Sequence, residues 1–344
     1  MTETIPAGFS SAKFPSAEEL AARAHVVVLP LKVRFRGVVE REVLLLDGPA
    51  GWAEFAPFTE YADAEASAWL RGAVEAGWEG YPEPVRTHVP VNATVPAVPP
   101  SGVERVLGAY DAAHTVKIKV AEAGQALADD VARVAEVRRL LPGAALRIDA
   151  NAGWTLDQAL EALEALEALA PYGLQYAEQP VAGIEGLRRL RAEVARRGLG
   201  ILLAADESVR KESDPLAVAR AEAADLIVVK APPLGGVRRA LRIVAEAGLP
   251  AVVSSALDTS VGTRTGAALA AALPELPYAC GLGTVSLFAA DVAAEPYVAR
   301  GGMLDLRTVA ADPELVERHA ADPARRRWWL ERLRRCRELL VSGT

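Results

Sequence analysis

The stretch Thr115-Val116-Lys117-Ile118-Lys119-Val120 decides how the rest of the chain is interpreted. Apolar residues alternate with Thr115, Lys117 and Lys119, so a β-strand would place the lysines on one face and the apolar residues on the other. In a parallel barrel the apolar face packs against the surrounding helices, and both lysines then point into the barrel. An edge strand with a solvated lysine face is the alternative. Lysine is scarce in this chain, because only six of the 38 basic residues are lysines.

Short β-like runs like this one recur at intervals of about 25–30 residues, which is the strand–helix rhythm of a parallel barrel. The segments between them are rich in Ala, Leu, Arg and Glu with helical spacing, as in residues 127–141 and 156–170. An open doubly wound sheet would normally carry a glycine-rich turn after its first strand, and NATVPAVPP at 92–100 is no such turn. The eight runs are 88–95, 115–120, 145–150, 174–178, 201–207, 225–230, 250–256 and 277–283.

The two ends of the chain do not follow this repeat. Residues 25–58 predict two or three antiparallel strands with a turn at Asp47-Gly48-Pro49, followed by a helix from about residue 63 to 77. Near the C-terminus, a helix carries an apolar stripe on one face and arginines on the others. We expect it to dock through this stripe on the N-terminal module, although basic amphipathic helices also bind membranes or nucleic acids. The stripe consists of Trp329, Leu333, Cys336 and Leu340.

The composition limits the class of protein. Of the 344 residues 51% are hydrophobic and 24% charged, and the net charge of −7 argues against general nucleic-acid binding. The start MTETIPAGFSSAKF lacks the pattern of a secretory signal, and no apolar run is long enough to span a bilayer. Cys280 and Cys336 are too few and too far apart for a disulfide framework. We therefore expect a cytoplasmic protein that does not associate with membranes.

Charged residues stand at the ends of five consecutive predicted strands. Barrel active sites lie at the C-terminal ends of the strands, where an ordinary core strand would avoid charge. The second and sixth strands of an eight-strand ring lie opposite each other, so ammonium groups would face one another across three carboxylates. The strand ends carry, in order, Lys117 and Lys119, Asp149, Glu178, Asp206-Glu207, and Lys230.

Three converging carboxylates would repel one another unless a cation lay between them. Mg²⁺ or Mn²⁺ suits carboxylate oxygens and leaves coordination positions for a substrate. The alternative is that the acids pair with nearby arginines, for example Asp149 with Arg147. The four histidines are scattered, and none stands at the end of a strand, which argues against a histidine-based zinc site.

This combination suits proton abstraction next to a carboxylate. The enediolate that results concentrates negative charge on oxygen, which a metal ion disperses while a lysine accepts the proton. Such a lysine must lose its own proton near neutral pH, and a neighbouring cation lowers its pKa. Lys117 beside Lys119 meets that requirement.

Five motifs in this order resemble the muconate-lactonizing branch of the enolase superfamily. They are K-x-K at 117–119, D-x-N at 149–151, A-E-Q-P at 177–180, D-E-S at 206–208, and Lys230. Residues 36–58 resemble the capping domain of that family. The resemblance implies an α/β fold with a (β/α)₈-type barrel, in its enolase-like (β/α)₇β form, and an α+β capping domain. We expect the capping domain at 1–87, the barrel at 88–290, and a C-terminal segment at 291–344 that packs on the capping domain.

Two further segments are similar to those of o-succinylbenzoate synthases, one activity of this branch. Residues 253–262 resemble their S-S-x-x-x-S/T-S-x-G segment, and residues 280–284 resemble their G-L-x-T strand. This likeness implies a hydro-lyase of menaquinone synthesis, which dehydrates the small carboxylate 2-succinyl-6-hydroxy-2,4-cyclohexadiene-1-carboxylate. An N-succinylamino-acid racemase or a dipeptide epimerase on the same scaffold is the alternative. A barrel that has lost catalysis would lack one of the acids or lysines, and none is missing.

The resemblance also implies a role for each candidate residue. Lys119 would remove the proton and return it to the leaving hydroxyl, beside Lys117, while Lys230 would stabilise the enediolate or lie against the ring. Asp149, Glu178 and Asp206 would hold Mg²⁺ or Mn²⁺. Asn151 and Glu207 would support these ligands, Ser254 and Ser255 would bind the succinyl end, and the capping residues 55–61 would close over the substrate.

Overall fold

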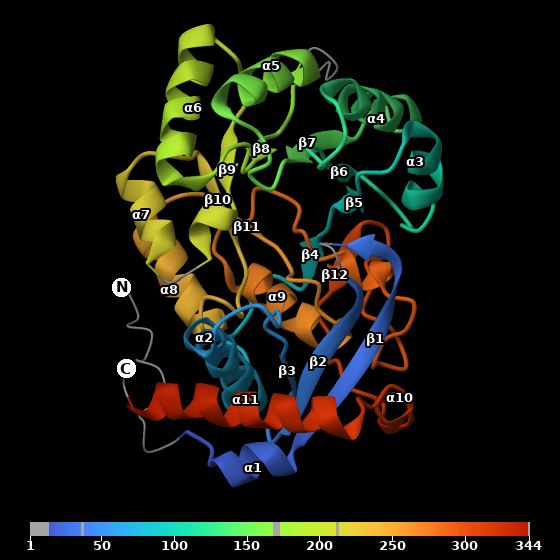
Figure 1. Ribbon diagram of the computed structural model, residues 1–344, viewed down its shortest axis with the longest axis vertical. Helices are drawn as coiled ribbons and strands as arrows, with labels where there is room; N and C mark the ends of the chain where they lie inside the picture. The colour runs from blue at the N-terminus through green and yellow to red at the C-terminus, as the bar shows by residue number, and fades with distance from the viewer. Residues whose placement is uncertain (1–13, 36–37, 168–172, 211–212, 343–344) are drawn as a thin grey trace.

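The computed structural model describes residues 14–35, 38–167, 173–210 and 213–342. Figure 1 shows a barrel surrounded by helices above a smaller module of long antiparallel strands, with the C-terminal helix lying across the base. Strands within the described ranges form a three-stranded, a seven-stranded and a two-stranded sheet. No helix among these residues is both long and apolar enough to cross a membrane. Residues 1–13, most of the N-terminal stretch that lacks the pattern of a secretory signal, lie outside the described ranges.

The N-terminal module is an antiparallel sheet with helices, as expected from residues 25–58. The strands β1 (Ala24–Phe35), β2 (Val38–Gly48) and β3 (Gly51–Phe55) are joined in sequence order, with Gly48 paired to Gly51 across the expected turn. Four consecutive residues of β2, Val43 to Leu46, are buried, so both faces of this strand are covered. The helices here are α1 (Ala17–Ala22), α2 (Asp63–Val74) and the π-helical turn η2 (Glu75–Glu79), which extends the helix expected at 63–77.

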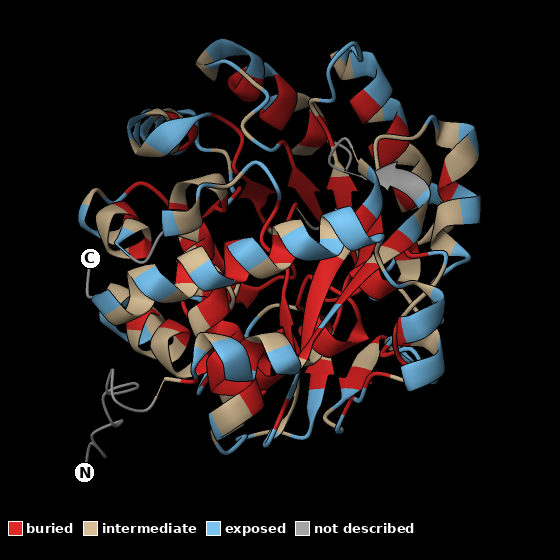
Figure 2. Ribbon diagram, turned by 60° about the horizontal axis from the view of Figure 1, so that its bottom comes forward, coloured by how far each residue is buried: buried red, intermediate tan, exposed pale blue. Residues whose placement is uncertain are grey.

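The barrel is a parallel sheet in the order β5-β6-β7-β8-β9-β10-β11, so each strand pairs with the next along the chain. The short apolar strands are buried, in keeping with a sheet that is covered by helices (Figure 2). Six of the predicted runs coincide with these strands. The strands after the first are β6 (Thr115–Lys119), β7 (Ala145–Asp149), β8 (Ala177–Glu178), β9 (Leu203–Ala205), β10 (Leu226–Val229) and β11 (Ala251–Val253).

The first predicted run, 88–95, is wrong as a single strand. It forms β4 (His88–Pro90), which pairs antiparallel with β12 (Met303–Asp305), and β5 (Ala93–Val95), which begins the barrel sheet. Part of the chain beyond residue 290 therefore lies against the start of the barrel. The eighth run, 277–283, closes the ring through two isolated bridges, Val91 to Cys280 and Ser254 to Gly281. The result is a (β/α)₇β barrel, as the resemblance implied.

Helices follow the barrel strands in alternation. The helix expected at 156–170 is observed as far as Glu167, and its last three residues lie outside the described ranges. The helices are α3 (Pro100–Leu107), α4 (Leu127–Leu140), α5 (Leu156–Glu167), α6 (Gly183–Arg197), α7 (Asp214–Arg220), α8 (Val237–Ala247) and α9 (Ser260–Ala272), with 3₁₀ turns η3 (Glu207–Val209) and η4 (Thr284–Leu287).

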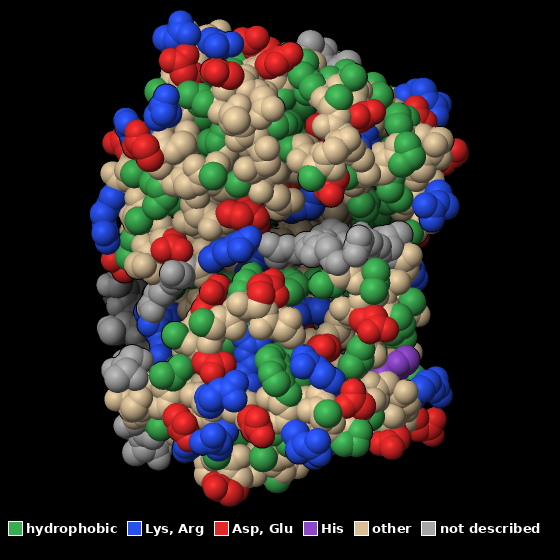
Figure 3. All heavy atoms as spheres, viewed as in Figure 1, with side chains coloured by type: hydrophobic (Ala, Val, Ile, Leu, Met, Phe, Trp, Pro, Cys, Tyr) green, Lys and Arg blue, Asp and Glu red, His purple; other side chains and the backbone are tan. Residues whose placement is uncertain are grey.

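The C-terminal helices α10 (Pro313–Arg318) and α11 (Pro323–Ser342) complete the module at the base. Trp329, Leu333 and Cys336 of the predicted stripe are buried, and the Trp329 ring meets the Phe55 ring edge-on at 5.9 Å. Helix α11 packs mainly on α2, so the expected docking is confirmed. Its outer face shows basic side chains interspersed with acidic ones rather than a continuous basic surface (Figure 3).

Candidate active site

A small cavity of about 40 Å³ lies at the C-terminal ends of the barrel strands. Both ends of the strand sequence β5 to β11 contribute to it, together with the segment that closes the ring. Eight of the ten candidate residues line this cavity, and Glu178 and Glu207 lie next to it. The lining residues are Thr94, Lys117, Lys119, Asp149, Asn151, Asp206, Lys230, Ser254, Ser255, Ala256, Leu257, Gly281 and Thr284.

Strand register explains why the charged residues meet. In the parallel pairs, Lys119 lies beside Asp149, and Asp149 lies beside Glu178. Val116 and Ile118 are fully buried on the opposite face of β6, so the lysines point into the barrel as their alternation predicts. The alternative of an edge strand with solvated lysines is therefore wrong.

Lys117 lies deepest among the three lysines of the cavity. Its Nζ is 3.0 Å from both Asp149 Oδ2 and Glu178 Oε1. Burial acts to lower the pKa of Lys117, but Asp149 and Glu178 outweigh that effect and raise the pKa well above its ordinary value. Lys117 is thus a fixed positive charge beside Lys119.

Lys119 lies closer to the cavity mouth. Its Nζ donates to Asp149 Oδ2 at 2.6 Å and to Asn151 Oδ1 at 2.6 Å. Asn151 has a left-handed backbone with φ of 46°, and its Nδ2 donates to Glu207 Oε1 at 3.1 Å. Asn151 therefore orients the Lys119 ammonium, and Glu207 orients Asn151.

Lys230 approaches from the other side of the ring. It follows β10 directly, and its Nζ makes a close ion pair with Asp206, which follows β9. Burial acts to raise the pKa of Asp206, but Lys230 outweighs it and lowers the pKa below its ordinary value. The structure thus divides the cavity between a Lys117–Lys119 side and a Lys230 side.

The three carboxylates differ in how their charge is balanced. Burial acts to raise the pKa of Asp149, but Lys117 and Lys119 outweigh it and hold the pKa far below its ordinary value. Burial, followed by the charge of Asp149, raises the pKa of Glu178 to about 8 despite Lys117. Glu178 is therefore the carboxylate whose ionisation most needs further positive charge.

These carboxylates suit a hard divalent cation by their chemistry, since all three are buried oxygen donors on adjacent strands. Their oxygens contact lysine ammonium groups instead of converging on one point. Within the described ranges, no three Asp, Glu, His or Cys side chains are arranged as a metal ion would require. Metal binding would therefore have to displace ammonium groups from the carboxylates.

The pairing of the acids with arginine, considered as an alternative, does not occur at Asp149. The Arg147 guanidinium points into the lower part of the barrel, where it donates to Gln175, the Tyr176 hydroxyl and the Ala279 carbonyl. Its side chain thus fills the barrel beneath the cavity.

Ser254 and Ser255 form part of the cavity wall. Ser255 Oγ lies 2.6 Å from Thr284 Oγ1, and Ser255 N donates to the Gly281 carbonyl at 3.0 Å. A Cβ on Gly281 would lie 2.7 Å from Ser254 Oγ, so only glycine leaves room for this serine. The two segments singled out from the sequence, 253–262 and 280–284, therefore lie side by side.

Two family models match the chain. The model described as "Enolase C-terminal domain-like" matches residues 103–310, and "Enolase N-terminal domain-like" matches residues 26–77. Among curated relatives, the "o-succinylbenzoate synthase" of Mycolicibacterium smegmatis is 51% identical over 95% of this chain and 98% of its own length. Those of Mycobacterium leprae and Mycobacterium tuberculosis are 51% and 49% identical over 95% and 96% of this chain, and over 95% and 98% of their own lengths. The chain belongs to the o-succinylbenzoate synthase family of the enolase superfamily.

Solved structures support the fold. Muconate lactonizing enzyme from Pseudomonas putida aligns with a TM-score of 0.71 at 19% identity, covering 87% of this chain and 98% of that one. 2-Chloromuconate cycloisomerase from Rhodococcus opacus aligns with a TM-score of 0.70 at 23% identity and the same coverage. At this identity the likeness shows the barrel and its capping domain alone.

Two polar residues at or beside this cavity were not predicted from the sequence. Thr94 lines the cavity from the end of β5. Gln179 is fully buried, and its Oε1 accepts from the amides of Asp206 and Ser208 at 3.0 and 3.1 Å. Gln179 therefore fixes the turn that presents Asp206. Its place directly after Glu178 in A-E-Q-P was the available signal.

Residues 55–61, expected to close over the substrate, contribute nothing to the described lining of this cavity. Arg332 of α11 donates to the carbonyls of Phe58 and Tyr61, and the Arg41 guanidinium lies 4.2 Å from the centre of the Phe58 ring. These contacts fix the capping loop on the side of the N-terminal module. Two further lysines, Lys13 and Lys211, are not among the residues that the structure describes.

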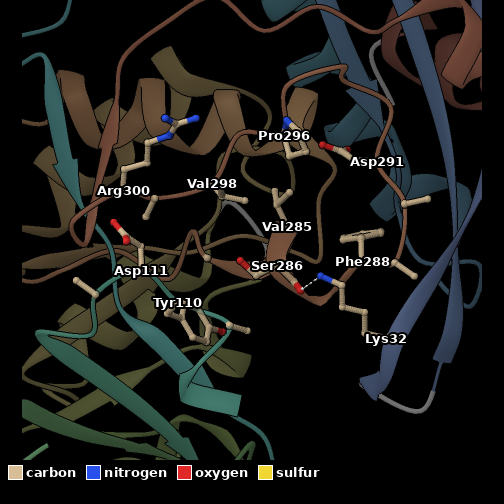
Figure 4. Close-up of a pocket in the computed structure, with 16 residues that line it drawn as sticks. Lys32, Tyr110, Asp111, Val285, Ser286, Phe288, Asp291, Pro296, Val298 and Arg300 are labelled. Carbon is tan, nitrogen blue, oxygen red and sulfur yellow. Dashed lines mark hydrogen bonds between the residues drawn. The ribbon is translucent and has the colours of Figure 1, made fainter. Parts of the chain in front are cut away.

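A larger cavity of about 440 Å³ is lined by Lys32 of β1, residues 109–112 and the segment 283–300 (Figure 4). Its charged side chains already have partners. Lys32 donates to the Ser286 carbonyl, Asp111 accepts from the Gly301 amide, Asp291 accepts from Ser260, and Arg300 pairs with Glu295. None of the ten candidate residues lines it. The smaller cavity is therefore the one that brings the candidate residues together.

Proposed function

We propose that this chain is a divalent-metal-dependent o-succinylbenzoate synthase, a hydro-lyase of menaquinone biosynthesis. It would convert 2-succinyl-6-hydroxy-2,4-cyclohexadiene-1-carboxylate to 2-succinylbenzoate by syn elimination of water. The observation that carries the proposal is the cluster of three lysines and three buried carboxylates at the barrel mouth. Curated synthases that are about half identical over nearly the whole chain support the choice of substrate.

Lys119 acts as the single acid–base group in this proposal. In its neutral form the amine removes the proton next to the substrate carboxylate, and the resulting ammonium returns a proton to the hydroxyl that leaves from the same face. One group suffices because both events occur on one side of the ring. Lys117 lies beside it as a charged neighbour, and Asn151 orients the Lys119 amine through its hydrogen bond.

Lys230 faces the reacting ring from the opposite side of the cavity. Its positive charge would stabilise the enediolate, either by direct attraction or from a position over the ring. Asp206 keeps the Lys230 ammonium in place. Lys230 therefore requires no proton transfer in the dehydration.

Asp149, Glu178 and Asp206 would hold the metal ion, Mg²⁺ or Mn²⁺. When bound, this ion supplies positive charge for the substrate carboxylate as it becomes an enediolate. Glu207 and Asn151 would keep the metal-binding side of the cavity oriented through their mutual hydrogen bond. Ser254 and Ser255 would meet the succinyl end of the substrate.

Substrate binding also requires the cavity to enlarge. Ligand pockets usually hold roughly 300–1,000 Å³, far more than the volume present here. Release of Lys119 and Lys230 from Asp149 and Asp206, the carboxylates that would hold the metal ion, would open space in the centre.

We also propose that the enzyme works in the cytoplasm on a free small carboxylate, without a nucleic-acid or membrane partner. Cys280 and Cys336 are both buried and unpaired, which suits a reducing compartment. The net charge of −7 disfavours binding to polyanions.

The position of lysines on both sides of the cavity also suits an N-succinylamino-acid racemase or a dipeptide epimerase, which needs a base on each face. The two functions can be separated with purified protein and Mg²⁺ in deuterated water. Dehydration of the cyclohexadiene substrate is expected to far exceed α-deuterium exchange into N-succinylamino acids. Rapid exchange without 2-succinylbenzoate formation would reject the synthase and favour the racemase.

A further inference from the structure

One wall of the active-site cavity is held in an unusual backbone conformation. The segment Ser254–Leu257 connects β11 to α9 and lines the cavity. Leu257 has a φ of 64°, which a leucine rarely adopts and keeps only where surrounding contacts enforce it. Within the segment, the Ala256 amide donates to Asp258 Oδ2 at 3.1 Å. Two buried side chains of the capping domain contact this segment and the start of α9 that follows it.

Arg41 of β2 makes the first of these contacts. It is only 3% exposed, and its Nε donates to the Leu257 carbonyl at 3.2 Å, although the two residues are 216 positions apart. The same guanidinium donates to the Ala56 carbonyl and lies over the Phe58 ring. One side chain thus joins the capping loop to the barrel wall.

Glu54 of β3 makes the second contact from the capping domain, at the start of α9. Its Oε2 accepts from the Thr259 amide at 3.1 Å, the Thr259 hydroxyl at 2.6 Å and the Gly262 amide at 3.1 Å. These donors form the start of α9, whose amides have no partners within the helix. A Cβ on Gly262 would lie 2.6 Å from the Glu54 carboxyl carbon, so the contact depends on glycine at this position.

We propose that Arg41 and Glu54 are positioning residues for substrate binding, through which the capping domain sets the shape of the Ser254–Leu257 wall from behind. Neither lines the cavity, and their described hydrogen bonds run to Ala56, Leu257, Thr259 and Gly262. They act through the Leu257 carbonyl and the first turn of α9. Because the wall carries Ser254 and Ser255, its displacement weakens binding of the succinyl end and leaves Lys119 in place. This inference rests on the proposed function.

Arg332 provides a matched control for Arg41. It is equally buried, donates to the carbonyls of Phe58 and Tyr61 in the same capping loop, and pairs with Asp63 of α2. None of these partners belongs to the cavity wall. Arg41→Met and Arg332→Met therefore each remove a buried guanidinium, and only the first releases Leu257.

Steady-state kinetics of dehydration with Mg²⁺ test the proposal. Arg41→Met is expected to raise KM about tenfold, the factor that one lost buried hydrogen bond produces, while kcat changes little. Glu54→Ala should shift KM in the same direction, Arg41→Lys should recover part of the loss, and Arg332→Met should leave KM unchanged. An unchanged KM in Arg41→Met, or equal rises in both arginine variants, would overturn the proposal.

Hydrogen–deuterium exchange supplies a readout that does not depend on activity. Peptides that cover residues 254–263 should exchange faster in Arg41→Met and Arg41→Lys than in wild type, and at the wild-type rate in Arg332→Met. Equal exchange in all four proteins would contradict the positioning role. If the wild-type protein produced no 2-succinylbenzoate, the proposed function would fail, whereas the exchange experiment would still test whether Arg41 holds the wall.

Discussion

Lys119 lies between two oxygen atoms, one from Asp149 and one from Asn151, and next to a lysine that stays charged. The inward direction of both lysines could be predicted from the alternation in 115–120 because a strand offers only two faces. The individual environments of Lys117 and Lys119 could not be predicted from this pattern. The depth of Lys117, and its contact with both Asp149 and Glu178, depends on the stagger of three strands that are separate in sequence.

Replacement of Lys119 by alanine is expected to lower kcat for dehydration by about 10²–10⁴, the usual contribution of a general acid–base group. KM should change less, because the wall and the carboxylates remain. Lys32→Ala is the control, since Lys32 donates to the Ser286 carbonyl outside the small cavity and should retain activity. Full activity in Lys119→Ala, measured as initial rates of 2-succinylbenzoate formation, would show that another group moves the proton.

At the scale of the elements, the order of the barrel strands follows from the rhythm of short apolar runs, and the site follows from the charges at their ends. The division of 88–95 into β4 and β5 could not be predicted in this way. Both halves are apolar and β-like, and what separates them is the pairing of β4 with β12, more than 200 residues later. Local sequence carries no information on such a partner.

Helix α9 gives an element-scale prediction through its contact with β3. Gly262→Ala is expected to destabilise the protein by about 1–3 kcal/mol, because the added methyl group would overlap the Glu54 carboxylate. A Cβ on Gly143 would meet nothing within 4 Å, so Gly143→Ala should be nearly neutral. Urea unfolding of the two variants compares them directly. Equal stability would mean that β3 and α9 are less tightly packed than described.

At the scale of the whole molecule, the capping domain and the barrel share a buried group of charges. Glu54 and Asp258 lie on opposite sides of the interface between the two domains, near Arg41. The composition and the motifs predict both domains, but the contacts that unite them connect residues more than 200 positions apart. These contacts depend on the folded arrangement, and no local pattern reveals them.

This buried group makes stability depend on pH. Burial, followed by the charge of Asp258, raises the pKa of Glu54 from 4.5 to about 8. Between these two values the folded protein holds a proton that the unfolded chain has lost, so this group's contribution to stability falls as the pH rises. The loss of stability caused by ionisation of buried Glu54 is absent below the lower pKa and complete above the upper one.

Glu54→Gln should therefore lose less stability than wild type between about pH 5 and about pH 8. The free energy of unfolding in urea, measured at both pH values for each protein, gives the difference that belongs to Glu54 and cancels the groups they share. Parallel pH profiles for the two proteins would mean that Glu54 titrates normally.

The central claim is that this barrel mouth dehydrates its substrate with a metal ion held by Asp149, Glu178 and Asp206. The most direct measurement is the rate of 2-succinylbenzoate formation by the purified protein after removal of metal by a chelator, and again after Mg²⁺ is restored. The account predicts loss of the rate on chelation and its recovery with Mg²⁺ in wild type, but no recovery in Asp206→Asn. A rate that survives chelation, or the absence of product with Mg²⁺, would contradict it.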